Sequence, residues 1–82
     1  MMTIWDDELR VVMDKAQARY GDFASVHEAL GVAMEEFDEL RNAIHENNLP
    51  GVAHEAIDLA AVLLRLVECL DRGGKILDRS VK

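Results

Sequence analysis

Cysteine is nearly absent from this sequence: Cys69 is the only one in 82 residues. A single cysteine excludes an intrachain disulfide and a thiolate zinc cluster built within one chain. Basic residues are also scarce, with 9 Lys and Arg against 16 Asp and Glu and a formal net charge of −7. That balance argues against a nucleic-acid backbone or an anionic membrane as the main partner, because both require a basic face. It favours a protein that binds cations, or that binds anions through cations.

Long apolar runs are missing as well. No apolar stretch approaches about 18 residues, and no charged n-region with an apolar h-region opens the sequence. We therefore expect a soluble, cytoplasmic protein. A chain of 82 residues with 50% apolar content predicts one globular domain over residues 1–82. A single core of this size is marginally stable, and oligomerisation is a common remedy.

Proline and glycine are few, and their positions divide the chain. They gather at Gly21, in the segment 47–51 that holds the only proline, and at Gly73 and Gly74. Between them, helix formers and apolar residues at helical spacing predict helices over about residues 4–20, 25–46 and 50–72. For the tail, residues 73–82, the sequence is compatible with either a short helix or a loose segment. The sequence thus predicts an all-α fold in which three main helices form a bundle.

The third predicted helix is apolar nearly all round between Ala56 and Val67. Ile57 and Leu64 lie on one side of it, opposite Leu59, Val62 and Leu66. A helix that is apolar on both sides is buried on both sides. We therefore expect this helix to pack across a subunit interface, so that a homodimer or homotetramer completes the bundle.

Acidic pairs at spacing i, i+3 occur four times, and their phase on the helix separates them. At about 100° per residue, Glu36 falls within an apolar stripe with Glu39 at its edge. On the next helix, Glu55 falls within an apolar stripe with Asp58 at its edge. The other two pairs lie on polar faces and are expected to be solvated: Glu35 with Asp38, and Glu68 with Asp71.

Inward-facing carboxylates need a partner, because burying an unpaired charge costs free energy. Few basic residues are placed to pair with these acids, and Arg65 approaches Asp58 only at the edge of the apolar stripe. A divalent cation between the two helices satisfies all four acids, and an all-oxygen set favours Mg²⁺ or Mn²⁺ over Zn²⁺. A di-iron bundle is excluded, since no Glu is followed by His at i+3. The alternative is that these acids are partly exposed at an interface and bind nothing.

These motifs resemble the MazG-like, all-α nucleoside triphosphate pyrophosphohydrolases, relatives of the dimeric dUTPases and phosphoribosyl-ATP pyrophosphatases. The family motif is Glu-x-x-Glu on one helix and Glu-x-x-Asp on the next, here residues 36–39 and 55–58. The flanking segments 23–29, 34–40 and 60–65 look like the compact phage and mobile-element members. The resemblance covers about residues 20–72.

The resemblance implies Mg²⁺-dependent cleavage of a (d)NTP between the α- and β-phosphates, giving a monophosphate and pyrophosphate. Glu36, Glu39, Glu55 and Asp58 would be the metal ligands, and one of them would orient or deprotonate the attacking water. It further implies that Lys75 and Arg79, at i, i+4, hold phosphates; a frayed basic tail is the alternative. A different class of function also stays open, a non-catalytic acidic helical module that oligomerises and binds a protein.

The aromatic residues are Trp5, Tyr20, Phe23 and Phe37. Any of them is a candidate for stacking on a base. Phe37 is predicted to belong to the core, and Trp5 and Tyr20 to a core or interface stripe of the first helix.

Overall fold

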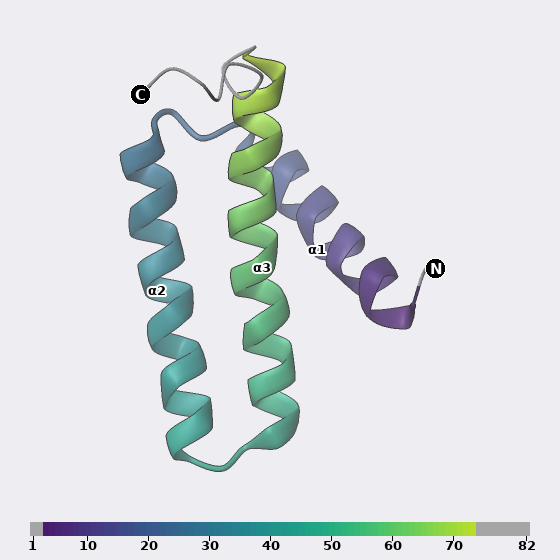
Figure 1. Ribbon diagram of the computed structural model, residues 1–82, viewed down its shortest axis with the longest axis vertical. Coiled ribbons are helices and arrows are strands. Elements are labelled where there is room, and N and C mark those ends of the chain that lie inside the picture. Colours follow the sequence, from purple (N-terminus) through teal and green to yellow (C-terminus); the bar gives the residue numbers. More distant parts are fainter. Residues whose placement is uncertain (1–2, 74–82) are drawn as a thin grey trace, which may run out of the picture.

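The computed structural model describes residues 3–73 of the chain, which fold into three α-helices (Figure 1). Helix α1 spans Ile4–Tyr20, α2 spans Val26–His45 and α3 spans Leu49–Arg72. No strand occurs among these residues. The all-α prediction is therefore confirmed, with helix bounds within a residue or two of those expected. None of the three helices is both long and apolar enough to cross a bilayer.

Helix α3 lies at the centre of the arrangement. It runs antiparallel to α2, while α1 crosses it on another side (Figure 1). The core between the helices is built largely from small residues, which allow close approach: Met13, Ala29, Ala43, Ala61 and Val62 are all buried. The α2–α3 hairpin is closed by a short turn in which Asn47 takes a positive φ of 55°, a conformation that asparagine tolerates well.

One apolar side of α3 is partly covered within the chain. Helix α1 packs on the side that carries Leu64, which lines a hollow with Leu9 and Met13. Arg10 of α1 also donates a hydrogen bond to Glu68 of α3 at 3.0 Å. The packing of α3 across a subunit interface stays a prediction. Several large apolar side chains of α3 still remain 42–48% exposed, namely Leu63, Leu64 and Val67.

The start of α2 is fixed by Ser25, which precedes the helix as its N-cap. The Ser25 hydroxyl accepts the Glu28 N–H at 3.1 Å, a backbone donor that the first turn of a helix leaves free. The Glu28 carboxylate accepts the N–H of Ala24 at 2.8 Å and so holds the segment that leads into the helix.

Removing this cap has a predictable cost. We expect Ser25→Ala to lower the free energy of unfolding by about 1 kcal/mol, because the Glu28 N–H loses its acceptor. Urea unfolding followed by circular dichroism measures the change. Ser25→Asp, which restores an acceptor, serves as the control and should keep the wild-type value. Equal loss in both variants would show that the hydroxyl does not act as the cap.

Candidate functional site

The two acidic motifs are brought together by the antiparallel hairpin of α2 and α3. Glu39 and Glu55 each lie eight residues from Asn47 in the turn, and Glu36 and Asp58 each lie eleven residues from it. Since each helical residue rises about 1.5 Å, members of each pair stand at the same height above the turn. The spacing between the motifs and the short turn therefore place four carboxylates opposite one another.

Three of the four carboxylates form a tight cluster. One oxygen from each of Glu36, Glu39 and Glu55 lies within 4.8 Å of the others. Glu36 and Glu55 are half-buried, whereas Glu39 is exposed. Glu36 Oε2 and Glu55 Oε1 are shielded from solvent and have no hydrogen-bond partner within residues 3–73. Two shielded carboxylate oxygens without a donor are unfavourable unless a proton or a cation reaches them.

Burial and mutual repulsion change the titration of this cluster. Burial, then the charges of Glu39, Asp58 and Glu55, raise the pKa of Glu36 from 4.5 to about 7. Burial, followed by the charges of Glu39 and Asp58, also raises the pKa of Glu55. Both shifts have the sign expected of carboxylates that share one site. Near neutral pH Glu36 is therefore partly protonated, and a cation that binds the cluster would displace this proton.

Asp58 stands beside the cluster but outside its tight group of three. Its side chain is 26% exposed, and its Oδ2 lies 3.8 Å from Nε2 of His54 one turn earlier. Its negative charge acts on both Glu36 and Glu55. The predicted four-acid site is thus assembled as three close carboxylates with a fourth beside them.

The other two acidic pairs contribute no oxygen to the close group of Glu36, Glu39 and Glu55. Asp38 is exposed and pairs with Arg41 at 3.4 Å, and Asp71 is exposed. Glu35 is exposed and lies at the edge of the cavity described next. Glu68 is the partner of Arg10, a contact between helices that the sequence did not predict.

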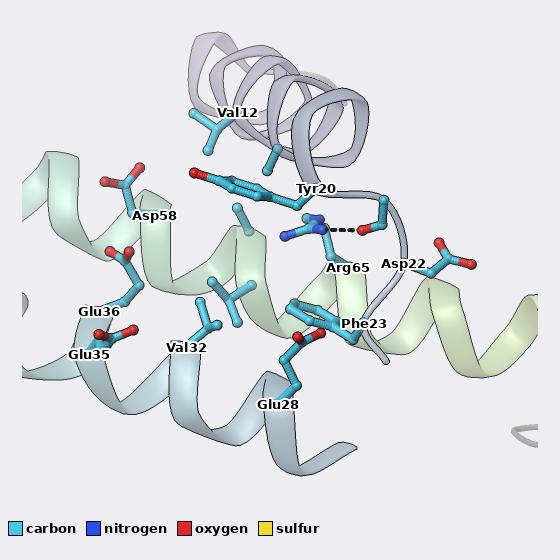
Figure 2. Close-up of a pocket in the computed structure, with 14 residues that line it drawn as sticks. Val12, Tyr20, Asp22, Phe23, Glu28, Val32, Glu35, Glu36, Asp58 and Arg65 are labelled. Carbon is cyan, nitrogen blue, oxygen red and sulfur yellow. Dashed lines mark hydrogen bonds between the residues drawn. The ribbon is translucent and has the colours of Figure 1, made fainter. Parts of the chain in front are cut away.

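A cavity of about 610 Å³ opens between the three helices, with Glu36 and Asp58 at one end (Figure 2). Its middle is apolar and includes Val12, Val32, Ala61 and Val62. Its other end is formed by Tyr20, Phe23 and Arg65 (Figure 2). The acidic cluster therefore borders a space of the size that a small-molecule ligand occupies.

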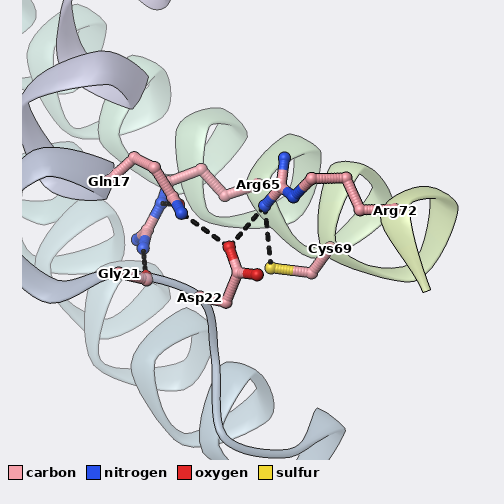
Figure 3. Close-up of polar contacts among 6 residues, drawn as sticks. All are labelled: Gln17, Gly21, Asp22, Arg65, Cys69 and Arg72. Carbon is pink, nitrogen blue, oxygen red and sulfur yellow. Dashed lines mark hydrogen bonds and ion pairs between the residues drawn. The ribbon is translucent and has the colours of Figure 1, made fainter.

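Arg65 is the residue of this region that the sequence most clearly failed to assign. It is only 5% exposed, and its Nη2 donates to the Gly21 carbonyl oxygen at 2.8 Å (Figure 3). Its Nε donates to Gln17 Oε1 at 3.4 Å. Arg65 follows Asp58 by seven residues, or about two turns, so both share one helix face. The spacing of seven residues could have indicated that Arg65 lines the same cavity as Asp58.

The prediction that Phe37 belongs to the core is wrong, because Phe37 is 54% exposed. Trp5 and Tyr20 are 61% and 69% exposed, so neither belongs to the core of the chain, and an interface role for them stays a prediction. Lys75 and Arg79, the predicted phosphate ligands, lie outside the described residues.

Comparison of the chain with protein-family models, with curated proteins and with solved structures gives no significant match. The resemblance to MazG-like pyrophosphohydrolases therefore stays a prediction that depends on the two acidic motifs. The structure adds to those motifs the distances between the carboxylates and the cavity beside them.

Proposed function

We propose that the protein is a Mg²⁺-dependent pyrophosphohydrolase that cleaves a (d)NTP between the α- and β-phosphates. The observation that carries this proposal is the cluster of Glu36, Glu39 and Glu55, whose oxygens lie within 4.8 Å of one another beside a cavity. Carboxylate oxygens are the ligands that Mg²⁺ and Mn²⁺ prefer. A bound cation also explains how a chain with a net charge of −7 accepts a polyanionic substrate.

The residues of the site divide into those that hold the cation and those that surround it. Glu36, Glu39 and Glu55 would hold it, with Asp58 adding a fourth negative charge next to them. The cation would neutralise charge on the phosphates and lower the pKa of bound water. A carboxylate oxygen that does not bind the cation would accept a hydrogen bond from the attacking water.

The proposal is tested by incubating the purified chain with Mg²⁺ and a panel of canonical and altered (d)NTPs. We expect release of one pyrophosphate per monophosphate, and no release in EDTA. Release of inorganic phosphate alone would contradict cleavage between the α- and β-phosphates. Absence of turnover on every nucleotide, with folding insensitive to Mg²⁺, would favour the non-catalytic alternative.

An exposed apolar stripe on α2 supports the proposed assembly of a homodimer or homotetramer. Its members fall within about 80° of one another on the helix and are each at least half exposed: Val26, Leu30, Met34, Phe37 and Ile44. Arg41 falls within the same arc, between Phe37 and Ile44. An exposed apolar strip along one helix is typical of a surface that another helix covers. In the non-catalytic alternative, this α2 stripe would be the binding surface itself.

We expect the wild-type chain to have the mass of a dimer or tetramer by light scattering at micromolar concentration. Phe37→Glu places a charge in the middle of the α2 stripe and should weaken association at least about tenfold. Ile4→Glu is a suitable control, because Ile4 is 73% exposed at the start of α1 and lies outside the stripe. A monomeric wild type would refute the assembly.

A further inference from the structure

The end of the cavity opposite the acids contains a buried cation that no carboxylate neutralises. Arg65 is 5% exposed, yet within residues 3–73 no carboxylate oxygen lies within the 4.0 Å of an ion pair. Its two hydrogen bonds go to neutral oxygens, of Gly21 and Gln17 (Figure 3). A buried guanidinium held by neutral acceptors alone is costly, and it keeps most of its donating capacity.

The donors that remain on Arg65 lie at the cavity. Arginine has five N–H groups, of which two are used in the bonds to Gln17 and Gly21. Nη1 has no acceptor among the described residues, and Arg65 is part of the cavity wall. Both bonds that Arg65 makes go to carbonyl oxygens, and the site therefore offers its further N–H donors to a ligand that brings a carbonyl oxygen.

The walls around Arg65 suit a flat ring. The guanidinium carbon lies over the Phe23 ring, 4.6 Å from its centre, so the ring helps to hold the cation in place. Tyr20 flanks the same end of the cavity, and Val32 continues its apolar wall toward the acids (Figure 2). Aromatic side chains beside a fixed donor are the usual means by which proteins stack and read an unpaired base.

A phosphate group fits this end poorly. Asp22 lines it but is paired with Arg72 (Figure 3). Glu28 also lines it and pairs with no cation among residues 3–73 (Figure 2). The charge of Glu28 would repel a phosphate more than a neutral ring. Arg65 lies about 10 Å along the α3 axis from Asp58. One ligand in the cavity therefore reaches both the acidic cluster and Arg65.

We propose that Tyr20, Phe23 and Arg65 form a nucleobase site, and that Arg65 selects bases with a ring carbonyl oxygen over adenine. Guanine, uracil, thymine and cytosine carry such an oxygen, and adenine does not. This inference depends on the proposed function for the claim that the phosphates lie at the acidic end. The nucleobase site itself contains no cation ligand, so it can be tested without metal.

The test measures binding of guanosine, uridine and adenosine to the full chain in EDTA by NMR titration. We expect guanosine and uridine to bind about tenfold more tightly than adenosine, and to shift the Arg65 Nε–H and the Phe23 ring signals. Equal affinity for the three nucleosides, or binding that leaves these signals unchanged, would overturn the proposal. So would displacement of the nucleosides by inorganic phosphate in EDTA, which would show that Arg65 holds an anion.

Variants separate recognition from folding. Arg65→Lys keeps the charge but loses the planar donors, and should remove the preference over adenosine. Tyr20→Ala should weaken the binding of all three nucleosides severalfold. Trp5 is a similarly exposed aromatic residue of α1 that does not line the cavity, so Trp5→Ala should leave their binding unchanged. If Arg65→Lys is unfolded by circular dichroism, Tyr20→Ala and Trp5→Ala decide the result, and equal affinities in the two would overturn the proposal.

The nucleobase site and the proposed pyrophosphohydrolase activity can be refuted independently. Mg²⁺-dependent pyrophosphate release without nucleoside binding in EDTA would refute the nucleobase site alone. Selective nucleoside binding without any pyrophosphate release would retain the nucleobase site and refute the chemistry proposed for the acidic end.

Discussion

Glu55→Gln is expected to reduce Mg²⁺-dependent pyrophosphate release by about 100-fold or more while leaving the helical fold unchanged. Loss of an outer-shell partner of a metal ligand already costs about 10- to 100-fold, so loss of a ligand itself should cost at least as much. The fold should survive, because Glu55 Oε1 makes no hydrogen bond within residues 3–73 that the substitution would break. Glu36→Gln removes the other shielded carboxylate and should have the same effect.

The measurement is a steady-state assay of pyrophosphate release, with circular dichroism as the check on folding. Asp38→Asn is the matched control: it removes one charge from the outer face of α2, where Asp38 pairs only with Arg41. Its turnover should stay within about twofold of the wild type, as is usual for a surface substitution. Unchanged turnover in Glu55→Gln would refute the assignment of the site.

The phase of the acidic pairs was the part of the site that the sequence could predict. Helical periodicity determines which residues share a face, so the inward position of Glu36 and Glu55 followed from their neighbours. The distances of the two motifs from Asn47 also follow from the sequence once the turn is recognised. Together these two relations are enough to place the carboxylates opposite one another.

Helical periodicity does not determine which element packs against each apolar face of a helix. The pattern of α3 shows that two sides are apolar, but it does not tell whether α1 or a second copy packs there. The exposed position of Phe37 has the same origin, since an apolar residue is buried only if another element reaches it. Within one chain, α1 reaches α3 and leaves the α2 stripe exposed.

The role of Arg65 depends on a non-helical segment. Its acceptor is the carbonyl oxygen of Gly21, a residue with a positive φ of 72° that ends α1 and turns the chain toward α2. The following Phe23 then places its ring against the guanidinium. Glycine permits this turn at little steric cost. Its direction in space, however, is set by the packing of α1 on α3, which no local pattern determines.

The stability of the metal-free protein is expected to fall as the pH rises from about 5 to about 7.5. Folding raises the pKa of Glu36 from 4.5 to about 7, so the folded chain holds a proton that the unfolded chain has released over this range. The free energy of unfolding therefore decreases as that proton is lost, by about 1–2 kcal/mol once partial solvent exposure is taken into account. Urea unfolding in EDTA at several pH values measures the decrease.

Two comparisons attribute this pH dependence to the acidic cluster. Glu36→Gln should be more stable than the wild type at pH 7.5 in EDTA and nearly equal to it at pH 5, because the amide carries no charge at either pH. Asp38→Asn should retain the wild-type dependence. Parallel curves for the wild type and Glu36→Gln would mean that the cluster is not repulsive when empty.

Magnesium should reverse the loss of stability at neutral pH. A cation that binds only the folded chain, present at 100 times its dissociation constant, adds about 2.7 kcal/mol. The gain should be large at pH 7.5 and small at pH 5, since protons on Glu36 and Glu55 compete with the cation. It should disappear in Glu55→Gln. A gain of equal size at both pH values, or one that persists in Glu55→Gln, would place the cation elsewhere on this acidic chain. The same four carboxylates would then remain a source of repulsion with no binding energy to offset it.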